Sequence, residues 1–237
     1  VFLESGSSGM ASVPSGASTG QHEAIEKRDK TKEFGGKSVF QAIDSIKGEI
    51  FDVVSGIEAQ DQSLVDQQMI QLDGTANKSR LGANAILAVS LATAKAAAAE
   101  LKLPLYRYLG GINACVLPIP FINIINGGAH ADNKLDFQEF MIVPVGANSF
   151  HQALQMANET FHCLKELLRQ KSFSTMVGDE GGFAPLISDP KQILNLITQA
   201  IEKSGYKLGT EIGLALDVAA SEFFKDNKYH LTGFKRV

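Results

Sequence analysis

The sequence contains no tryptophan, only two cysteines and no block of basic residues. Cys115 and Cys163 have no further cysteine or histidine at metal-ligand spacing, so we expect two buried thiols in a reducing compartment rather than a disulfide or zinc site. The 22 basic residues are outnumbered by 26 acidic ones, and the formal net charge is −4. This balance argues against nucleic acid or an anionic membrane as a partner, because both require clustered cations.

Long hydrophobic segments are also missing. The longest apolar run, residues 85–94, is interrupted by Ser90 and falls short of the roughly 18 residues that a membrane helix requires. No signal peptide is recognisable, and both Val1 and Val237 lie within patterned sequence, so we expect the 237 residues to be a fragment. Because 44% of the residues are hydrophobic and 20% are charged, we expect a folded globular chain.

The first half of the chain predicts helices. Apolar residues recur at steps of three and four over residues 36–54, which is the spacing of one helical face. Residues 59–72 and the alanine-rich residues 84–101 predict two more helices, and residues 1–13 predict a hairpin. The adjacent glycines Gly110 and Gly111 then end the last helix. We therefore predict a first domain over residues 1–111 and a second over residues 112–237.

The second half alternates strands and helices. Residues 116–125, 140–145 and 212–216 are apolar and predict strands that are buried on both faces. Helices are predicted over residues 149–170 and 189–204, the second with Asp189 as N-cap and Pro190 at its first position. This alternation predicts an α/β fold with a parallel sheet, open or barrel, and a site at the carboxyl ends of the strands.

Residues 178–185 contain two adjacent carboxylates, Asp179 and Glu180, flanked by three glycines and a proline. The glycines allow close approach to a ligand. Because neighbouring carboxylates repel each other, one of them is expected to have a raised pKa and to be able to act as a general acid. The alternative is an ordinary surface turn.

Further polar residues stand beside the predicted strands. Asp217 follows an apolar run, and a buried carboxylate there needs either a cation such as Mg²⁺ or a structural salt bridge. His130 follows two glycines, and Gln138 and Glu139 open the next strand. Each of these is a weak signal alone, since a single histidine is more often structural than catalytic.

Residues 16–20 match the G-x-S-x-G pattern of a hydrolase nucleophile, with Ser18 as the nucleophile and an aspartate and His230 following in the required order. That motif needs a buried strand directly before the serine, whereas Pro14 precedes it here. A flexible lid is the better interpretation.

Taken together, six motifs resemble the enolase family, in its bacterial form. The resemblance spans essentially the whole chain, and the order of the motifs makes it specific. The matching segments are residues 13–20, 78–91, 123–130, 138–141, 177–185 and 216–223.

The resemblance implies an N-terminal α+β capping domain followed by the first part of a (β/α)₈ barrel that is incomplete in this chain. It also implies dehydration of 2-phospho-D-glycerate to phosphoenolpyruvate, with two Mg²⁺ per complete site, in the cytoplasm of the cell. A homo-oligomer, either a dimer or an octamer, is the family's usual assembly. Removing a proton beside a carboxylate builds up negative charge, which metal ions neutralise before hydroxide departs.

The same resemblance implies a role for individual residues. Glu180 corresponds to the acid that protonates the departing hydroxyl, Glu139 assists it, and Asp217 binds the tighter metal. The substrate contacts it implies are Ala17, Ser18, His130, Gln138 and Glu139, and Ser18 also reaches the second metal.

The family pattern extends beyond both ends of this chain. It includes an earlier arginine and, later, two metal-binding acids, a lysine base, a phosphate-binding His-Arg-Ser group and a second lysine. We therefore expect the 237 residues alone to have negligible enolase activity. A serine hydrolase and a non-catalytic enolase-like binding protein are the alternatives; the presence of both Glu180 and Asp217 favours the enzyme.

Overall fold

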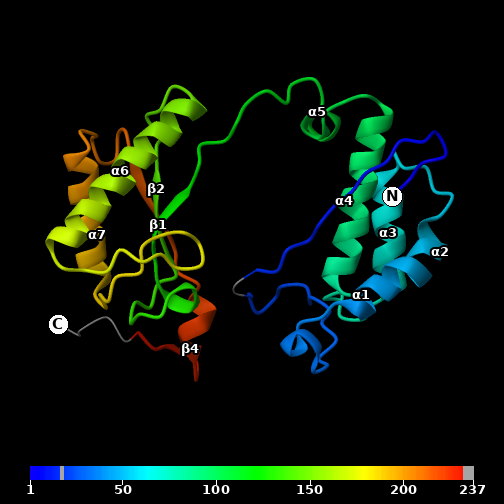
Figure 1. The fold of residues 1–237 in the computed structure, drawn as a ribbon, viewed down its shortest axis with the longest axis horizontal. Helices are drawn as coiled ribbons and strands as arrows, with labels where there is room; N and C mark the ends of the chain where they lie inside the picture. The colour runs from blue at the N-terminus through cyan, green and yellow to red at the C-terminus, as the bar shows by residue number, and fades with distance from the viewer. Residues whose placement is uncertain (17–18, 232–237) are drawn as a thin grey trace. The chain divides into compact units, whose positions relative to one another are not determined.

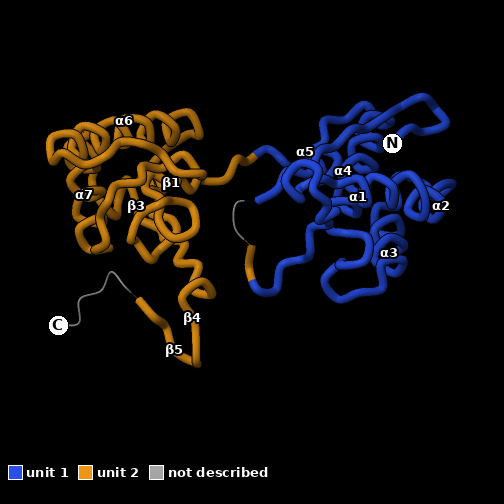
Figure 2. The backbone as a smooth tube through the Cα atoms, turned by 60° about the horizontal axis from the view of Figure 1, so that its bottom comes forward, with its two compact units in different colours: residues 1–16, 21–115 blue, residues 17–20, 116–237 orange. Residues whose placement is uncertain are grey.

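A computed structural model describes residues 1–16 and 19–231 of the chain. The chain divides into two compact units, of which one holds residues 1–16 and 21–115 and the other holds residues 17–20 and 116–237 (Figure 2). Each unit has its own hydrophobic core. In the described part of the chain, no helix has both the length and the apolar character needed to cross a membrane.

The first unit is built from helices. A short 3-10 turn, η1 (Glu33–Gly36), precedes a continuous helical stretch, and two long helices and a short one come after it. The core of this unit includes Ile50, Met69 and Leu81, which are fully buried. The helices predicted from periodicity are thus confirmed, with the first beginning four residues later than expected. They are α1 (Phe40–Ser45), η2 (Ile46–Ile50), α2 (Phe51–Val54), α3 (Gln62–Asp73), α4 (Ala83–Glu100) and α5 (Leu105–Gly110).

The hairpin predicted over residues 1–13 is reduced to one isolated bridge between Phe2 and Ser8. Gly9 lies directly against the backbone of α4: a Cβ on it would be 2.1 Å from the carbonyl oxygen of Ala92. Because the segment packs on a helix, its second arm has no room to continue a ladder. Among the described residues of this unit, this bridge is all that forms of the expected strands.

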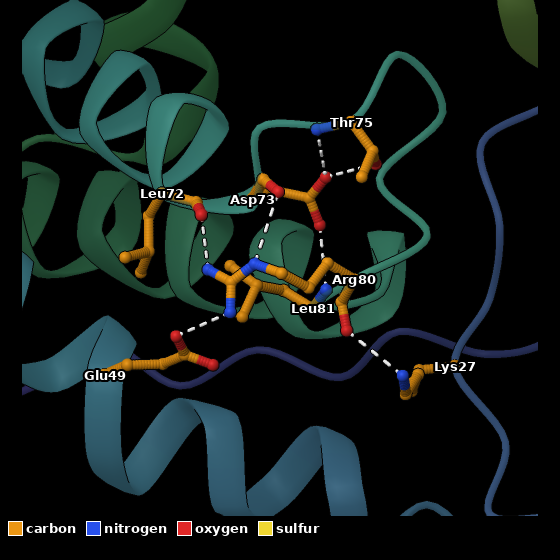
Figure 3. A network of polar contacts seen from close by, with 7 residues as sticks. All are labelled: Lys27, Glu49, Leu72, Asp73, Thr75, Arg80 and Leu81. Atoms are coloured by element: carbon orange, nitrogen blue, oxygen red, sulfur yellow. Dashed lines mark hydrogen bonds and ion pairs between the residues drawn. The ribbon is translucent and has the colours of Figure 1, made fainter.

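A buried aspartate joins α3 to α4 (Figure 3). Asp73 is 3% exposed, and its carboxylate accepts hydrogen bonds from the backbone N–H of Leu81 at 2.7 Å and of Thr75 at 3.0 Å. The Thr75 hydroxyl also donates to it. Arg80 donates to the Asp73 carbonyl at 3.2 Å and to the Glu49 carboxylate at 2.7 Å. The loop between the two helices is therefore fixed by a cluster in which each carboxylate oxygen of Asp73 has a donor.

The second unit contains a three-stranded sheet in the order β1-β2-β3, formed by β1 (Ile122–Asn126), β2 (Glu139–Val143) and β3 (Gly213–Asp217). Both pairs are antiparallel, so the predicted parallel sheet is wrong. A loop without a crossover helix joins β1 to β2, which permits only antiparallel pairing. Between β2 and β3, two helices carry the chain away and back again, so β3 begins at the end where β2 finishes. The described strands do not close into a barrel.

Two long helices, α6 (Phe150–Gln170) and α7 (Pro190–Lys203), lie side by side on one face of this sheet (Figure 1). Their apolar stripes pack against Phe140 and Ile142 of β2, both fully buried. The predicted cap of α7 is confirmed: Asp189 accepts from the backbone N–H of Lys191 and precedes Pro190. Helix α6 is capped in the same way by Ser149, which accepts from the backbone N–H of Gln152. The apolar residues whose spacing predicts the two helices are therefore the ones that pack against the sheet.

Several burial predictions for this unit are wrong. Residues 116–121 are not a strand, because Pro118 and Pro120 cannot donate to a ladder. Strand β3 lies at the edge of the sheet and leaves Leu214 and Leu216 37% and 40% exposed. The thiols are not buried either, since Cys115 is exposed and Cys163 is partly so; both are free, as expected.

Short elements complete the unit. The turn η3 (Gly128–His130) comes after β1, and η4 (Ala220–Phe223) comes after β3. A small hairpin then forms from β4 (Phe224–Lys225) and β5 (Lys228–Tyr229). Of these short elements, η3 is the one that carries a predicted site residue, His130.

Candidate active site

Three polar residues form a row across one end of the sheet. Asn126 at the end of β1 is opposite Glu139 at the start of β2, and Glu139 is opposite Asp217 at the end of β3. Directly opposed residues of an antiparallel pair project to the same face. Since Phe140 points to the helices, this row lies on the other face of the sheet. The site is thus at a strand end, as predicted, although the strands run in alternate directions.

His130 lies beside this row. It is 4% exposed, and its Nδ1 is 3.6 Å from Oε1 of Glu139 and 3.8 Å from Oε1 of Glu180. One ligand atom from each of these three residues falls within 4.8 Å of the others. The structure therefore brings together His130, Glu139 and Glu180, which come from three separate segments of the chain.

The loop that carries Glu180 is pressed against the end of β1. The Asp179 N–H donates to the carbonyl of His130 at 3.2 Å, and the Gly178 N–H donates to the carbonyl of Gly182 at 2.9 Å. A Cβ on Gly178 would lie 2.4 Å from the His130 carbonyl oxygen, and one on Gly182 would lie 2.4 Å from Oδ1 of Asn126. Gly178 and Gly182 are therefore required by close packing, whereas Gly181 has open space around it and a φ of +81°.

The carboxylates of the site repel one another. Burial raises the pKa of Glu139, and the negative charges of Glu180 and Asp217 raise it further, while His130 acts in the opposite direction. A raised pKa was expected for one of Asp179 and Glu180; the structure places one on Glu139. A carboxyl group that holds its proton more tightly than usual is suited to general acid chemistry.

The remaining predicted residues are placed individually. Gln138 is 5% exposed, its N–H donates to the carbonyl of Asp217 at 3.2 Å, and its Oε1 is buried without a hydrogen-bond partner among the described residues. Asp217 was expected to be buried, but it is exposed because β3 is an edge strand. Its Oδ1 accepts from the N–H of Ala219 at 3.0 Å. Ala17 and Ser18 lie outside the described residues.

The geometry of the described residues does not support the hydrolase alternative. Its histidine, His230, pairs through Nε2 with the carbonyl of Lys225 at 3.2 Å and through its N–H with the carbonyl of Phe223. Its serine, Ser18, lies outside the described residues. The described geometry therefore offers no support for the order of nucleophile, acid and base that this motif requires.

Two asparagines of β1 were missed by sequence reasoning. Asn123 donates from Nδ2 to Oδ1 of Asn126 at 2.5 Å, and both lie on the face that carries Glu139. The available signal was an amide side chain at each of two positions in an otherwise apolar strand. A polar group in a buried strand needs a partner or a function.

The donors of this site fit a hard divalent cation. Glu139, Glu180 and Asp217 supply carboxylate oxygens, the ligands that Mg²⁺ prefers, and their mutual repulsion is what a cation relieves. Among the described residues, Asp217 is exposed at the edge of the three-stranded sheet.

These features define an α/β protein with a cluster of acids and a histidine at one edge of a sheet. Family models agree with that class and refine it. The model of the enolase N-terminal domain matches residues 1–109, and the model of the enolase C-terminal TIM barrel domain matches residues 114–236. The chain belongs to the enolase family.

Proposed function

We propose that the protein is a lyase that dehydrates 2-phospho-D-glycerate to phosphoenolpyruvate. The observation that supports this reaction is the convergence of His130, Glu139, Glu180 and Asp217 at one end of the sheet. A β-elimination of water from a hydroxy acid needs a proton donor for the departing hydroxyl and compensation for the carboxylate charge. The cluster provides groups for both.

In this proposal Glu180 donates its proton to the departing hydroxyl. Its side chain is 45% exposed and so reachable by a substrate, whereas that of Glu139 is 16% exposed. Glu139 assists Glu180 in this proposal, and its pKa is raised by burial and by the charges of Glu180 and Asp217. His130 and Gln138 bind the substrate and orient its hydroxyl towards Glu180.

Asp217 would hold the tighter of two Mg²⁺ ions, and Ser18 would reach the second. When bound, the metal supplies the positive charge that stabilises the carboxylate after its α-proton has been removed. Closure of residues 16–20 would exclude water from this charged state. We further propose a cytoplasmic homo-oligomer for the protein.

The base that removes the α-proton is, by the family pattern, a lysine, and none of the residues assigned to the site here is one. We propose that the described cluster is the acid half of the site, and that the chain alone turns over substrate negligibly. Robust turnover by the 237 residues would contradict this.

The test is Glu180→Gln in the complete gene product. Loss of the acid should lower kcat by about 10²–10⁴-fold, followed through the ultraviolet absorbance of the enol product. Glu202→Gln, which neutralises an exposed carboxylate of α7, is the matched control and should leave kcat unchanged. If both variants retain full activity, Glu180 is not the acid.

A second measurement separates the enzyme classes. The proposed lyase should lose activity when Mg²⁺ is chelated and should not react with a phosphonate probe. A serine hydrolase would react with the probe and would lose that reaction in Ser18→Ala. An enolase-like binding protein would show neither activity in the complete gene product.

A further inference from the structure

Asn126 is the one residue of the row across the sheet to which no role has been given. It is fully buried at the end of β1, directly opposite Glu139. Its Nδ2 has no hydrogen-bond partner among the described residues, although its Oδ1 accepts from Asn123. A buried amide with an unused donor lowers stability, so this position calls for an explanation other than packing.

The backbone of β1 is shaped to present this amide. The register between β1 and β2 shifts between Asn123 and Ile125. Without that bulge, residues three apart in a strand would point to opposite faces. With it, Asn123 and Asn126 both project to the face of Glu139, and the hydrogen bond between them fixes the orientation of the Asn126 amide.

The loop that carries Glu180 rests on this amide. A Cβ on Gly178 would lie 2.6 Å from Nδ2 of Asn126, and one on Gly182 would lie 2.4 Å from its Oδ1. The backbone N–H of Asn126 also donates to the carbonyl of Phe183 at 2.9 Å. Both ends of the loop are therefore in contact with the same side chain, on either side of Glu180.

The unused donor and the carbonyl that orients the loop both lie close to Gly178. The His130 carbonyl oxygen, which accepts from the Asp179 N–H, and the Asn126 Nδ2 lie 2.4 Å and 2.6 Å from the same point, the Cβ position of Gly178. The amide thus sits where η3 and the loop meet. The same loop carries Glu180, whose Oε1 lies 3.8 Å from Nδ1 of His130.

We propose that Asn126 is a positioning residue: its side-chain amide holds residues 178–182 against the end of β1 and thereby sets Glu180 beside His130. The proposal rests on the proposed function for its catalytic consequence, but its structural part does not depend on activity. Asn126 does not touch the reacting atoms and acts through the loop.

The first test is amide hydrogen exchange in the 237-residue chain. Asn126→Ala should speed exchange at the Gly178 and Asp179 amides by about tenfold or more, while the amides of α7 keep their protection. Asn148→Ala, which truncates an exposed asparagine before α6, is the matched control and should change neither. Unchanged exchange at Gly178 and Asp179 in a folded Asn126→Ala variant would overturn the proposal.

Asn126→Asp removes the Nδ2 donor of the side chain while keeping its size and shape. It keeps an acceptor for Asn123 but replaces Nδ2 with an oxygen, so the proposal predicts faster exchange at the same two amides. A second variant pair tests the contact from the other side: Gly178→Ala should loosen the loop, whereas Gly213→Ala, whose Cβ would meet atoms at 3.7 Å and 3.8 Å, should not. Protection retained in both Asn126→Asp and Gly178→Ala would contradict a role for this contact.

The second test uses the complete gene product. Misplacing the acid should lower kcat of Asn126→Ala by about tenfold to a hundredfold and leave KM nearly unchanged. A purely structural defect would instead lower the folded fraction and leave kcat per folded molecule unchanged, which would overturn the catalytic part. Faster loop exchange in a protein without enolase activity would leave the positioning intact and reject the proposed function.

Discussion

The two units each bury a carboxylate in a polar cluster, and the two clusters are built in opposite ways. In the first unit, burial raises the pKa of Asp73, but hydrogen bonds from Leu81 and Thr75 and the charge of Arg80 outweigh it, and the net shift is downward. In the second unit, burial raises the pKa of Glu139, and the charges of two further carboxylates add to it. Donors surround Asp73, whereas further carboxylates face Glu139.

This difference separates a structural carboxylate from a chemical one. Asp73 is surrounded by the groups that an ionised carboxylate needs, so folding itself satisfies it. At the sheet edge, Glu139 faces Glu180 and Asp217, and the amides of Gln138 and Asn126 each retain a buried atom without a partner among the described residues. A proton, a cation or a substrate would satisfy these groups, and carboxylates perturbed in this way cluster at functional sites.

The comparison is tested most strongly by Asp73→Asn. The amide nitrogen would face either the Leu81 N–H or the Thr75 donors, so a buried donor loses its acceptor, and the free energy of unfolding should fall by about 1–3 kcal/mol. Urea denaturation measures it. Asp52→Asn, which changes an exposed carboxylate on α2, is the control and should have little effect.

The pH dependence of that variant has a defined sign. Because the pKa of Asp73 is lowered in the folded state, its contribution is present above the ordinary value of 3.8 and is lost as the pH falls through the lowered pKa. The stability difference between wild type and Asp73→Asn should therefore shrink in acid. A difference that stays constant there would mean that Asp73 does not stabilise through its charge.

Glu139→Gln is the analogous carboxylate-to-amide change at the other cluster, and it should change the free energy of unfolding in the opposite direction. The pKa of Glu139 is raised, so its contribution is present below the ordinary value of 4.5 and is lost as the pH rises through the raised pKa. Removing the charge should therefore increase the free energy of unfolding at neutral pH in the presence of a chelator, by less than Asp73→Asn decreases it. A loss of stability would show that the two clusters are alike.

Local features of both units could be predicted from the sequence. The start of α7 follows from Asp189 and Pro190, and the helical faces follow from apolar spacing, because capping and periodicity involve residues within a few positions of one another. The motifs that resemble the enolase family also placed His130, Glu139 and Glu180 in one site. The structure brings these three together.

The remaining features depend on contacts distant in sequence. The antiparallel pairing of β2 with β3 arises because α6 and α7 return the chain to the end where β2 finishes, and no local pattern encodes this. The exposure of Asp217 follows from the edge position of β3, and the role of Asn126 follows from a bulge and two glycines some fifty residues further along the chain. Strand neighbours decide burial, and a single sequence does not reveal them.

The smallest expected effect is at an exposed carboxylate that has good donors. Tyr206 donates to Glu159, which also accepts from Gln155 at 2.9 Å, and this hydrogen bond raises the pKa of Tyr206 to about 12. The pKa of Glu159 is lowered. The pair therefore stabilises the fold fully only between pH 4.5 and pH 10.0, the ordinary pKa values of the two groups, and its contribution is lost at higher pH as Tyr206 ionises.

Tyr206→Phe should remove the tyrosinate absorbance step near pH 12. It should change the free energy of unfolding at neutral pH less than Asp73→Asn does, because exposed pairs compete with water. A loss as large as that of Asp73→Asn would mean that donors alone, without burial, make a carboxylate structural.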